Sequence, residues 1–390
     1  MNALLQNAAG TMNATFPTLP WSVRLTYDGQ SSSFGNGAER SAIEFKTAEP
    51  LRCLARGDIP AFLDHYVAGD AELHGDIYGI VGVRRFVKDL KYWRVDLLRV
   101  ARYAWTTVFP SDIRRKLVAV SSHYDLPNGF IESYLDKRTK AYSCAMWKDP
   151  ANVAQPDDET LEDAQHNKFL MAATELELQP DDKFLDIGCG YGYMVHLAES
   201  HFGVKNALGI TLSQNQVDNG FTKSLALKHY LQVPADGSWT KVYTCGMVSH
   251  LDRSEIRQYY RHMYGMMKSG GRAWVHGIIP MANDSGLNHY TTISRTFSQR
   301  YVFPDHYQFP VHHHLKVMEE TGFLVRKIYF RYGHYGKTLR HWYRRYLETL
   351  PQTRHMITPT IERAWHLYLT FASEIDGHMS VLKQIVVEKP

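Results

Sequence analysis

Two hydrophobic periods alternate along the second half of the chain. Short apolar runs of strand length, FLDIG, ALGIT, KVYTCGM and RAWVHGI, are separated by stretches whose apolar residues recur at helical spacing. Helices are predicted from Glu162 to Leu178, from Tyr193 to Ser200, from Gln214 and from Ser254. Alternating strands and helices are typical of a doubly wound sheet whose strands are mostly parallel. We therefore expect an α/β, Rossmann-like fold in this part of the chain.

The first part of the chain has a different pattern. Residues 1–20 lack both a basic start and a long apolar run, which predicts a flexible leader rather than a signal peptide. Residues 21–110 mix strand-like runs such as WSVRLTYDG with helical ones and predict a smaller N-terminal α+β domain. Residues 111–390 form the second predicted domain.

A basic segment lies within the predicted N-terminal domain. Residues 84–102 carry seven basic and two acidic side chains, interleaved with apolar residues at helical spacing. This pattern predicts a basic amphipathic helix. Such a helix can pack on the protein with a solvated basic face, or it can lie on an anionic bilayer. The sequence leaves both interpretations open.

Composition excludes several classes of protein. Hydrophobic residues make up 44% and charged residues 22%, as in a globular protein with a sizeable core. We find no run of about 18 uncharged apolar residues, so no membrane span is expected. A net charge of +4 is too small to indicate a nucleic-acid partner. The four cysteines are scattered, which favours a reducing cytoplasm, and the adjacent histidines 312–314 point in different directions, so no metal site is expected.

The strongest local signal is the segment FLDIGCGYGYMVHLAES, residues 184–200. A short apolar strand ends at Asp186, and Gly188, Gly190 and Gly192 then form a tight turn into a helix. Glycines permit a close approach of backbone to ligand. A dinucleotide-binding site is the competing interpretation, but its G-x-G-x-x-G spacing is absent and no acid ends the second strand.

The wider sequence resembles the cyclopropane-fatty-acyl-phospholipid synthases and mycolic acid cyclopropane synthases. The motif HYDLPNGFIESYLDKRTKAYSCAMWKD (residues 123–149) precedes LDIGCGYG and GITLSQNQ, and WVHGI, YVFP and HYGKTLRHW follow. The resemblance covers roughly residues 121–388. It implies a class I methyltransferase fold that uses S-adenosylmethionine, and a lipid-binding role for the N-terminal domain.

The resemblance also implies two groups of site residues. The cofactor would be held by Tyr142, Ser143, Asp186, Gly188, Gly190, Gly192, Thr211 and Gln216. A bicarbonate ion near the transferred methyl would be held by Cys144, His276, Ile278 and Tyr335. Bicarbonate would serve as the base, because an alkene that takes up a methyl group becomes a carbocation and must lose a proton for the ring to close. The alternative to this bicarbonate-binding role is that Cys144, His276 and Tyr335 are ordinary core residues.

Two positions depart from the family pattern. Ser249 stands where the family has a glutamate that helps to fix bicarbonate, and a hydroxyl supplies no charge. The loop that usually carries an acid beside the adenine has Val233, with Asp236 displaced. The first departure puts ring closure in doubt more than methyl transfer.

We therefore expect a methyltransferase acting on the double bond of an unsaturated phospholipid acyl chain, giving a cyclopropane or methyl-branched product. The expected location is cytoplasmic, peripheral to the inner face of the membrane. Two alternatives stay open: a methyltransferase for an amine or another small acceptor, and a non-catalytic lipid-binding protein. A homodimer is also left open.

Overall fold

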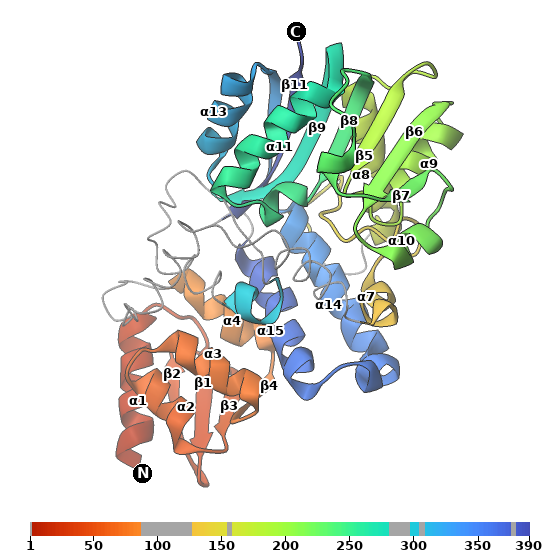
Figure 1. The fold of residues 1–390 in the computed structure, drawn as a ribbon. Helices are drawn as coiled ribbons and strands as arrows, with labels where there is room; N and C mark the ends of the chain where they lie inside the picture. Colours follow the sequence, from red (N-terminus) through yellow and green to blue (C-terminus); the bar gives the residue numbers. More distant parts are fainter. Residues whose placement is uncertain (1, 87–126, 154–157, 281–296, 304–308, 376–379) are drawn as a thin grey trace. The chain divides into compact units, whose positions relative to one another are not determined.

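The computed structural model describes residues 2–86, 127–153, 158–280, 297–303, 309–375 and 380–390 (Figure 1). The chain divides into two compact units, each built from three segments of sequence. The first unit comprises Met1–Phe109, Gly286–Pro304 and Arg354–Glu374, and the second comprises Pro110–Ser285, Asp305–Thr353 and Ile375–Pro390. Two segments of the predicted second domain, 111–390, thus group with the first unit.

The first unit contains a four-stranded sheet with the strand order β2-β1-β3-β4. β1 pairs in parallel with β3, and the other two pairs are antiparallel. The strands are β1 (Ser22–Tyr27), β2 (Gln30–Gly35), β3 (Glu39–Phe45) and β4 (Ala71–Gly75). The helices are α1 (Asn2–Thr15), α2 (Ala48–Ala55), α3 (Ile59–Ala68), α4 (Ile77–Val81), η1 (Gly82–Phe86), η5 (Arg354–Met356) and α15 (Pro359–Ile375).

The prediction of a flexible leader over residues 1–20 is wrong. α1 packs through Leu5, Ala8, Met12 and other apolar side chains into the core of the first unit. These residues recur every three or four positions, which is the period of a helix with one buried face. Thr11 Oγ1 also donates to Ala55 O of α2 at 3.0 Å. This segment has no long apolar run, because an amphipathic helix needs apolar residues on one face only.

The second unit contains a seven-stranded sheet with the order β10-β11-β9-β8-β5-β6-β7. The strands from β9 to β7 are parallel, whereas β11 pairs antiparallel with both β9 and β10. The predicted α/β fold with a mostly parallel sheet is thus confirmed. The strands are β5 (Lys183–Ile187), β6 (Asn206–Thr211), β7 (Leu225–Leu227), β8 (Trp239–Cys245), β9 (Met267–Pro280), β10 (Leu324–Arg331) and β11 (Ser380–Glu388).

Helices cover both faces of this sheet (Figure 1). Side chains of α8 and α9 form one apolar core with the sheet, and those of α11 and α13 form the other. The helices are α7 (Asn128–Tyr134), α8 (Leu161–Leu176), α9 (Tyr193–Ser200), α10 (Gln214–Asp218), α11 (Arg253–Met266), α13 (Val311–Thr321), α14 (His334–Thr353), η3 (Tyr230–Gln232) and η4 (Met247–His250). The layers are those of a doubly wound fold.

The side chains of β9 alternate between the two faces of the sheet. Trp274 packs into the core on the α8 side, whereas Val275 packs into the core on the α11 side. Since side chains alternate along a strand, His276 and Ile278 share the face of Trp274. β5 lies between β6 and β8, so the chain reverses its direction of winding there. Ligands of such folds bind at the carboxyl ends of the strands beside this reversal.

Some predictions fall outside the described residues. The basic segment 84–102 is described only as far as Phe86, in η1. Across the described ranges, no helix is long and apolar enough to cross a membrane. Among the three consecutive histidines, His314 lies buried on α13 with Nδ1 3.0 Å from Tyr260 Oη. Nowhere in the part of the chain that the structure describes do three potential metal-ligating side chains gather.

Candidate active site

The glycine turn follows β5 directly. The backbone N–H groups of Gly188 and Cys189 both donate to Ile210 O at 3.0 Å, which ties the turn to the end of β6. Gly188 and Gly190 have positive φ angles of 79° and 56°. A Cβ added to Gly190 would meet no atom within 4 Å, so the turn faces open space at this residue. This is the geometry expected of a backbone that a ligand approaches closely.

Gly192 differs from the other two glycines. Its φ is 77°, and a Cβ added there would lie 2.5 Å from Leu225 Cδ2. Gly192 is also the N-cap residue of α9. This glycine is therefore required for packing between the turn and β7, whatever its role toward a cofactor.

Asp186 lies at the end of β5 and is 2% exposed. No hydrogen-bond partner of its Oδ1 is found within the described ranges. Burial raises the pKa of this carboxyl well above its ordinary value, with the nearby Cys245 thiol adding to the rise and Lys168 opposing it. A buried acceptor without a donor costs free energy, so Asp186 is suited to receive hydrogen bonds from a ligand.

Thr211 and Gln216 contact each other after β6. Thr211 Oγ1 donates to Gln216 Oε1 at 2.6 Å. Ser213 caps α10 between them, with its side chain accepting from the backbone N–H of Gln216. The short helix thus fixes the two predicted cofactor residues against the carboxyl end of β6, beside the glycine turn.

Residues 141–147 form an extended segment that α8 and α14 hold in place. Gln165 Nε2 donates to Ser143 O at 2.7 Å, and the Ala145 N–H donates to Thr338 Oγ1 at 3.1 Å. Tyr142 stacks on Trp342, with ring centroids 5.3 Å apart. The segment therefore presents Tyr142, Ser143 and Cys144 from a fixed backbone.

A hydrogen-bonded chain sets the tautomer of His276. Arg331 Nε donates to Gln384 Oε1 at 2.9 Å, so the amide nitrogen of Gln384 faces His276 Nδ1, 3.3 Å away. An amide nitrogen only donates, so Nδ1 accepts and the imidazole proton is on Nε2. Burial lowers the pKa of His276 well below its ordinary value. His276 is thus a neutral hydrogen-bond donor, a role suited to binding an anion or carbonyl.

The other predicted pocket residues lie on neighbouring elements. Cys144 and Tyr335 belong to one small apolar cluster with Met146 and Leu382. Ile278 lies opposite Leu382 in the register of β9 and β11. Gln384 Nε2 also contacts Met146 Sδ at 3.5 Å, which links this cluster to His276. His276 is therefore close both to this apolar cluster and to the polar chain of Gln384 and Arg331.

Ser249 lies in η4 and is buried. A Cβ on Gly188 would lie 4.0 Å from Met247, and one on Gly277 would lie 2.5 Å from Val248 Cγ2. η4, the element that carries Ser249, therefore lies between the glycine turn and β9. In the second departure from the pattern, the displaced Asp236 accepts from Ser238 Oγ at 2.6 Å in an exposed position.

Two residues of α8, Lys168 and Gln165, were not predicted from the sequence. Lys168 is fully buried, and its Nζ donates to Ser143 Oγ and to Gln165 Oε1, each at 2.6 Å. The signal was present, because Lys168 falls on the apolar stripe of α8 with Leu161, Ala164 and Ala172. A lysine on such a stripe is rarely buried without a partner. Gln384 gave no signal, since it meets His276 only through the pairing of β9 with β11.

Comparison with known proteins identifies the family of the chain. The family model for mycolic acid cyclopropane synthetase matches residues 111–381. The chain belongs to this family. A probable fatty acid methyltransferase of Pseudomonas putida is 30% identical over 347 residues, which cover 83% of this chain and 81% of that protein.

Two further relatives show the extent of the likeness. The cyclopropane-fatty-acyl-phospholipid synthase of Escherichia coli (strain K12) is 26% identical over 262 residues, 66% of this chain and 63% of that enzyme. The cyclopropane synthase MmaA2 of Mycobacterium tuberculosis has the same fold, with a TM-score of 0.63 and 24% identity over 70% of this chain and 98% of its own. The protein is therefore an S-adenosylmethionine-dependent methyltransferase.

The residues at the carboxyl edge of the sheet fit this cofactor. The open side of Gly190 leaves room for a ligand against the backbone. Asp186 Oδ1, which has no partner among the described residues, can accept from hydroxyl or ammonium groups. Thr211 and Gln216 add polar groups at the end of the adjacent strand. The individual roles of these residues, as of the bicarbonate pocket, stay predictions.

Proposed function

We propose that this enzyme methylates the double bond of an unsaturated phospholipid acyl chain and gives a cyclopropane or methyl-branched fatty acid. Support comes from the relatives, which are named a fatty acid methyltransferase and a cyclopropane-fatty-acyl-phospholipid synthase. The observation that carries the proposal is the apolar cluster of Cys144, Met146, Leu382 and Tyr335 beside His276. Apolar side chains of this kind favour contact with a hydrocarbon chain over contact with a charged amine.

The chemistry needs a dry and weakly basic site. When bound, S-adenosylmethionine supplies an electrophilic methyl group, and an alkene is a weak nucleophile toward it. The protein's part is to hold the alkene in place and to exclude water, which would otherwise trap the cation formed on the acyl chain. We assign this part to buried Cys144 and half-buried Tyr335, which share one apolar cluster.

His276 is not suited to remove the proton itself. Its Nδ1 is engaged by Gln384 and its Nε2 carries the proton, so the neutral ring donates rather than accepts. We therefore keep bicarbonate in the proposal as the base. His276 would hold it through Nε2–H, with Tyr335 and Ser249 as the neighbouring hydroxyl groups. Ser249, in place of a glutamate, would hold it less firmly.

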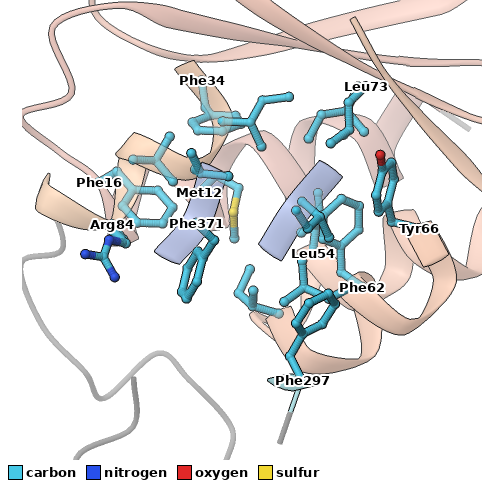
Figure 2. Close-up of a pocket in the computed structure, with 17 residues that line it drawn as sticks. Met12, Phe16, Phe34, Leu54, Phe62, Tyr66, Leu73, Arg84, Phe297 and Phe371 are labelled. Atoms are coloured by element: carbon cyan, nitrogen blue, oxygen red, sulfur yellow. The ribbon is translucent and has the colours of Figure 1, made fainter. Parts of the chain in front are cut away.

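The first unit has a cavity that supports a lipid-binding role (Figure 2). Its volume is about 100 Å³, and α1, α2, α3, β2 and α15 all contribute apolar side chains to its wall. Figure 2 shows Tyr66 and Arg84 at opposite ends of this apolar lining. The Arg84 guanidinium lies 5.0 Å from the Phe371 ring centroid and donates to Glu374 O. We propose that the cavity takes a short part of one acyl chain, with an anionic group of the lipid near Arg84.

Lipid mass spectrometry tests the main proposal. The enzyme is expressed in a host that lacks cyclopropane and methyl-branched fatty acids, and the acyl chains of its phospholipids are analysed. A gain of 14 mass units on unsaturated chains is expected, because one CH₂ is added. Unaltered acyl chains from a protein that binds S-adenosylmethionine would exclude the lipid substrate, and amine acceptors would be tested next.

The cavity is tested separately, by binding of a fluorescent fatty acid to the purified protein. Ile80→Trp places an indole in the space that an acyl chain would occupy and should weaken binding of the probe at least tenfold. Affinity for S-adenosylmethionine serves as the internal control, since that site belongs to the second unit. Unchanged probe binding by a folded variant would remove the cavity from the proposal.

A further inference from the structure

Lys168 is a buried charge at the predicted cofactor site. It lies in the middle of α8, 0% exposed, and burial lowers the pKa of its ammonium group. Its Nζ lies 4.3 Å from the centroid of the Phe169 ring on one side. Burying a lysine costs free energy that an apolar residue of similar length would not. A role in ligand binding would account for a charge in this position.

The hydrogen bonds of Lys168 have a fixed direction. An ammonium group donates and cannot accept, so both Ser143 Oγ and Gln165 Oε1 accept from it at 2.6 Å. Because the Gln165 oxygen faces the lysine, its amide Nε2 faces Ser143 O and donates to it at 2.7 Å. Lys168 thus orients Gln165, and Gln165 fixes the backbone of Ser143.

The direction in which the hydroxyl hydrogen of Ser143 points is fixed in the same way. Because Ser143 Oγ accepts from Lys168, its own O–H hydrogen points away from that lysine. A serine hydroxyl is otherwise free to donate or to accept. Here it is committed to donate to a different acceptor, and the cation behind it strengthens that donation.

We propose that Lys168 is a positioning residue that turns Ser143 into a hydrogen-bond donor for the carboxylate of S-adenosylmethionine. That carboxylate is the cofactor's one anionic group. Lys168 then places a positive charge behind Ser143 and Asp186 offers the acceptor Oδ1, which suits the amino-acid part of the cofactor, where a carboxylate and an ammonium share one carbon. The inference rests on Ser143 facing the cofactor and is independent of the lipid substrate.

The test compares two ligands that differ in the group concerned. S-adenosylhomocysteine keeps the carboxylate, whereas 5′-methylthioadenosine lacks the whole amino-acid part. Lys168→Met should weaken binding of S-adenosylhomocysteine roughly tenfold to a hundredfold. Binding of methylthioadenosine should change less than about twofold on the same reasoning. Calorimetry with each purified variant gives both affinities without any turnover.

Ser143→Ala and the double variant complete a thermodynamic cycle. If Lys168 acts through Ser143, the double variant should bind S-adenosylhomocysteine about as weakly as Ser143→Ala alone. Equal losses for both ligands would mean that Lys168 only supports the fold of the site, and the proposal would be wrong. Should Lys168→Met fail to fold, Ser143→Ala alone decides, because an unchanged affinity ratio between the two ligands would also overturn it.

Discussion

Thr211 and Gln216, two residues predicted to bind the cofactor, bind each other in the structure through a hydrogen bond of 2.6 Å. Thr211→Val keeps the shape of the side chain but removes the donor, so Gln216 loses its fixed orientation. One hydrogen bond contributes a net free energy of about 0.5–1.5 kcal/mol. Its loss therefore predicts a roughly two- to twelvefold weaker affinity for S-adenosylmethionine. Calorimetry measures this, and Thr211→Ser, which keeps the hydroxyl, should bind nearly as well as the wild type.

Gly190→Val should abolish cofactor binding, because its side chain would enter the open space beside the turn. The positive φ also strains any substituted residue, so a control must carry the same strain. Gly270 has a φ of 76° and likewise nothing within 4 Å of an added Cβ, but it lies at the other end of the sheet, in β9. Gly270→Val should lower Tm to a similar extent and leave cofactor affinity unchanged.

Asp186→Asn should lower cofactor affinity without lowering the stability of the cofactor-free protein. Burial raises the pKa of Asp186 in the folded state, so folding takes up a proton above the ordinary pKa of an aspartate. The free energy of unfolding therefore falls as pH rises from about 4 toward the raised pKa. An amide in place of the acid removes this loss, so the variant without cofactor should be at least as stable at pH 7 while its cofactor affinity falls.

Asp182→Asn is the matched control for that experiment. Asp182 is also buried and directly precedes β5, but it accepts from Thr240 Oγ1 at 2.7 Å and from the Gln179 N–H at 2.8 Å. Its substitution should lower stability without changing cofactor affinity. Denaturant unfolding and calorimetry on both variants give the comparison, and parallel behaviour of the two would contradict the role of Asp186.

His314 should make the second unit sensitive to acid. Burial lowers its pKa to about 3, whereas an unfolded histidine titrates near 6.5. The unfolded state therefore binds the proton first, and the free energy of unfolding falls by about 1.4 kcal/mol per pH unit below pH 6.5. His314→Asn retains an acceptor for Tyr260 and should reduce this slope. An unchanged slope between pH 6 and 4 would contradict the prediction.

Ser249→Glu should change the product rather than the rate of methylation. The added carboxylate would extend from η4, which lies between the glycine turn and β9, and would help to fix bicarbonate. Loss of one hydrogen bond to a charged group costs about 1.5–3 kcal/mol, or ten- to a hundredfold in rate. The cyclopropane fraction of the modified chains should therefore rise in the variant. A wild type that makes only cyclopropane would show that Ser249 has no such effect.

The fold of the second unit was predictable because its central strands are short apolar runs between amphipathic helices. β10 was missed since its exposed residues, such as Leu324 and Phe330, give no alternation. The glycine turn was evident from local sequence alone. Gln384 was not, because it reaches His276 across strands that are 108 residues apart in the chain. Local patterns thus predict elements, while partners from distant strands require the folded sheet.

The assembly of the first unit from three segments has a consequence for its synthesis. Leu367 and Phe371 of α15 line the cavity together with residues of α1 and α3. At about 5–20 residues per second, these two side chains leave the ribosome on the order of tens of seconds after α1. Until then α1 and α3 expose part of an apolar wall to water or to chaperones. The nascent chain therefore cannot complete its N-terminal unit first, and a fragment ending before residue 354 should aggregate.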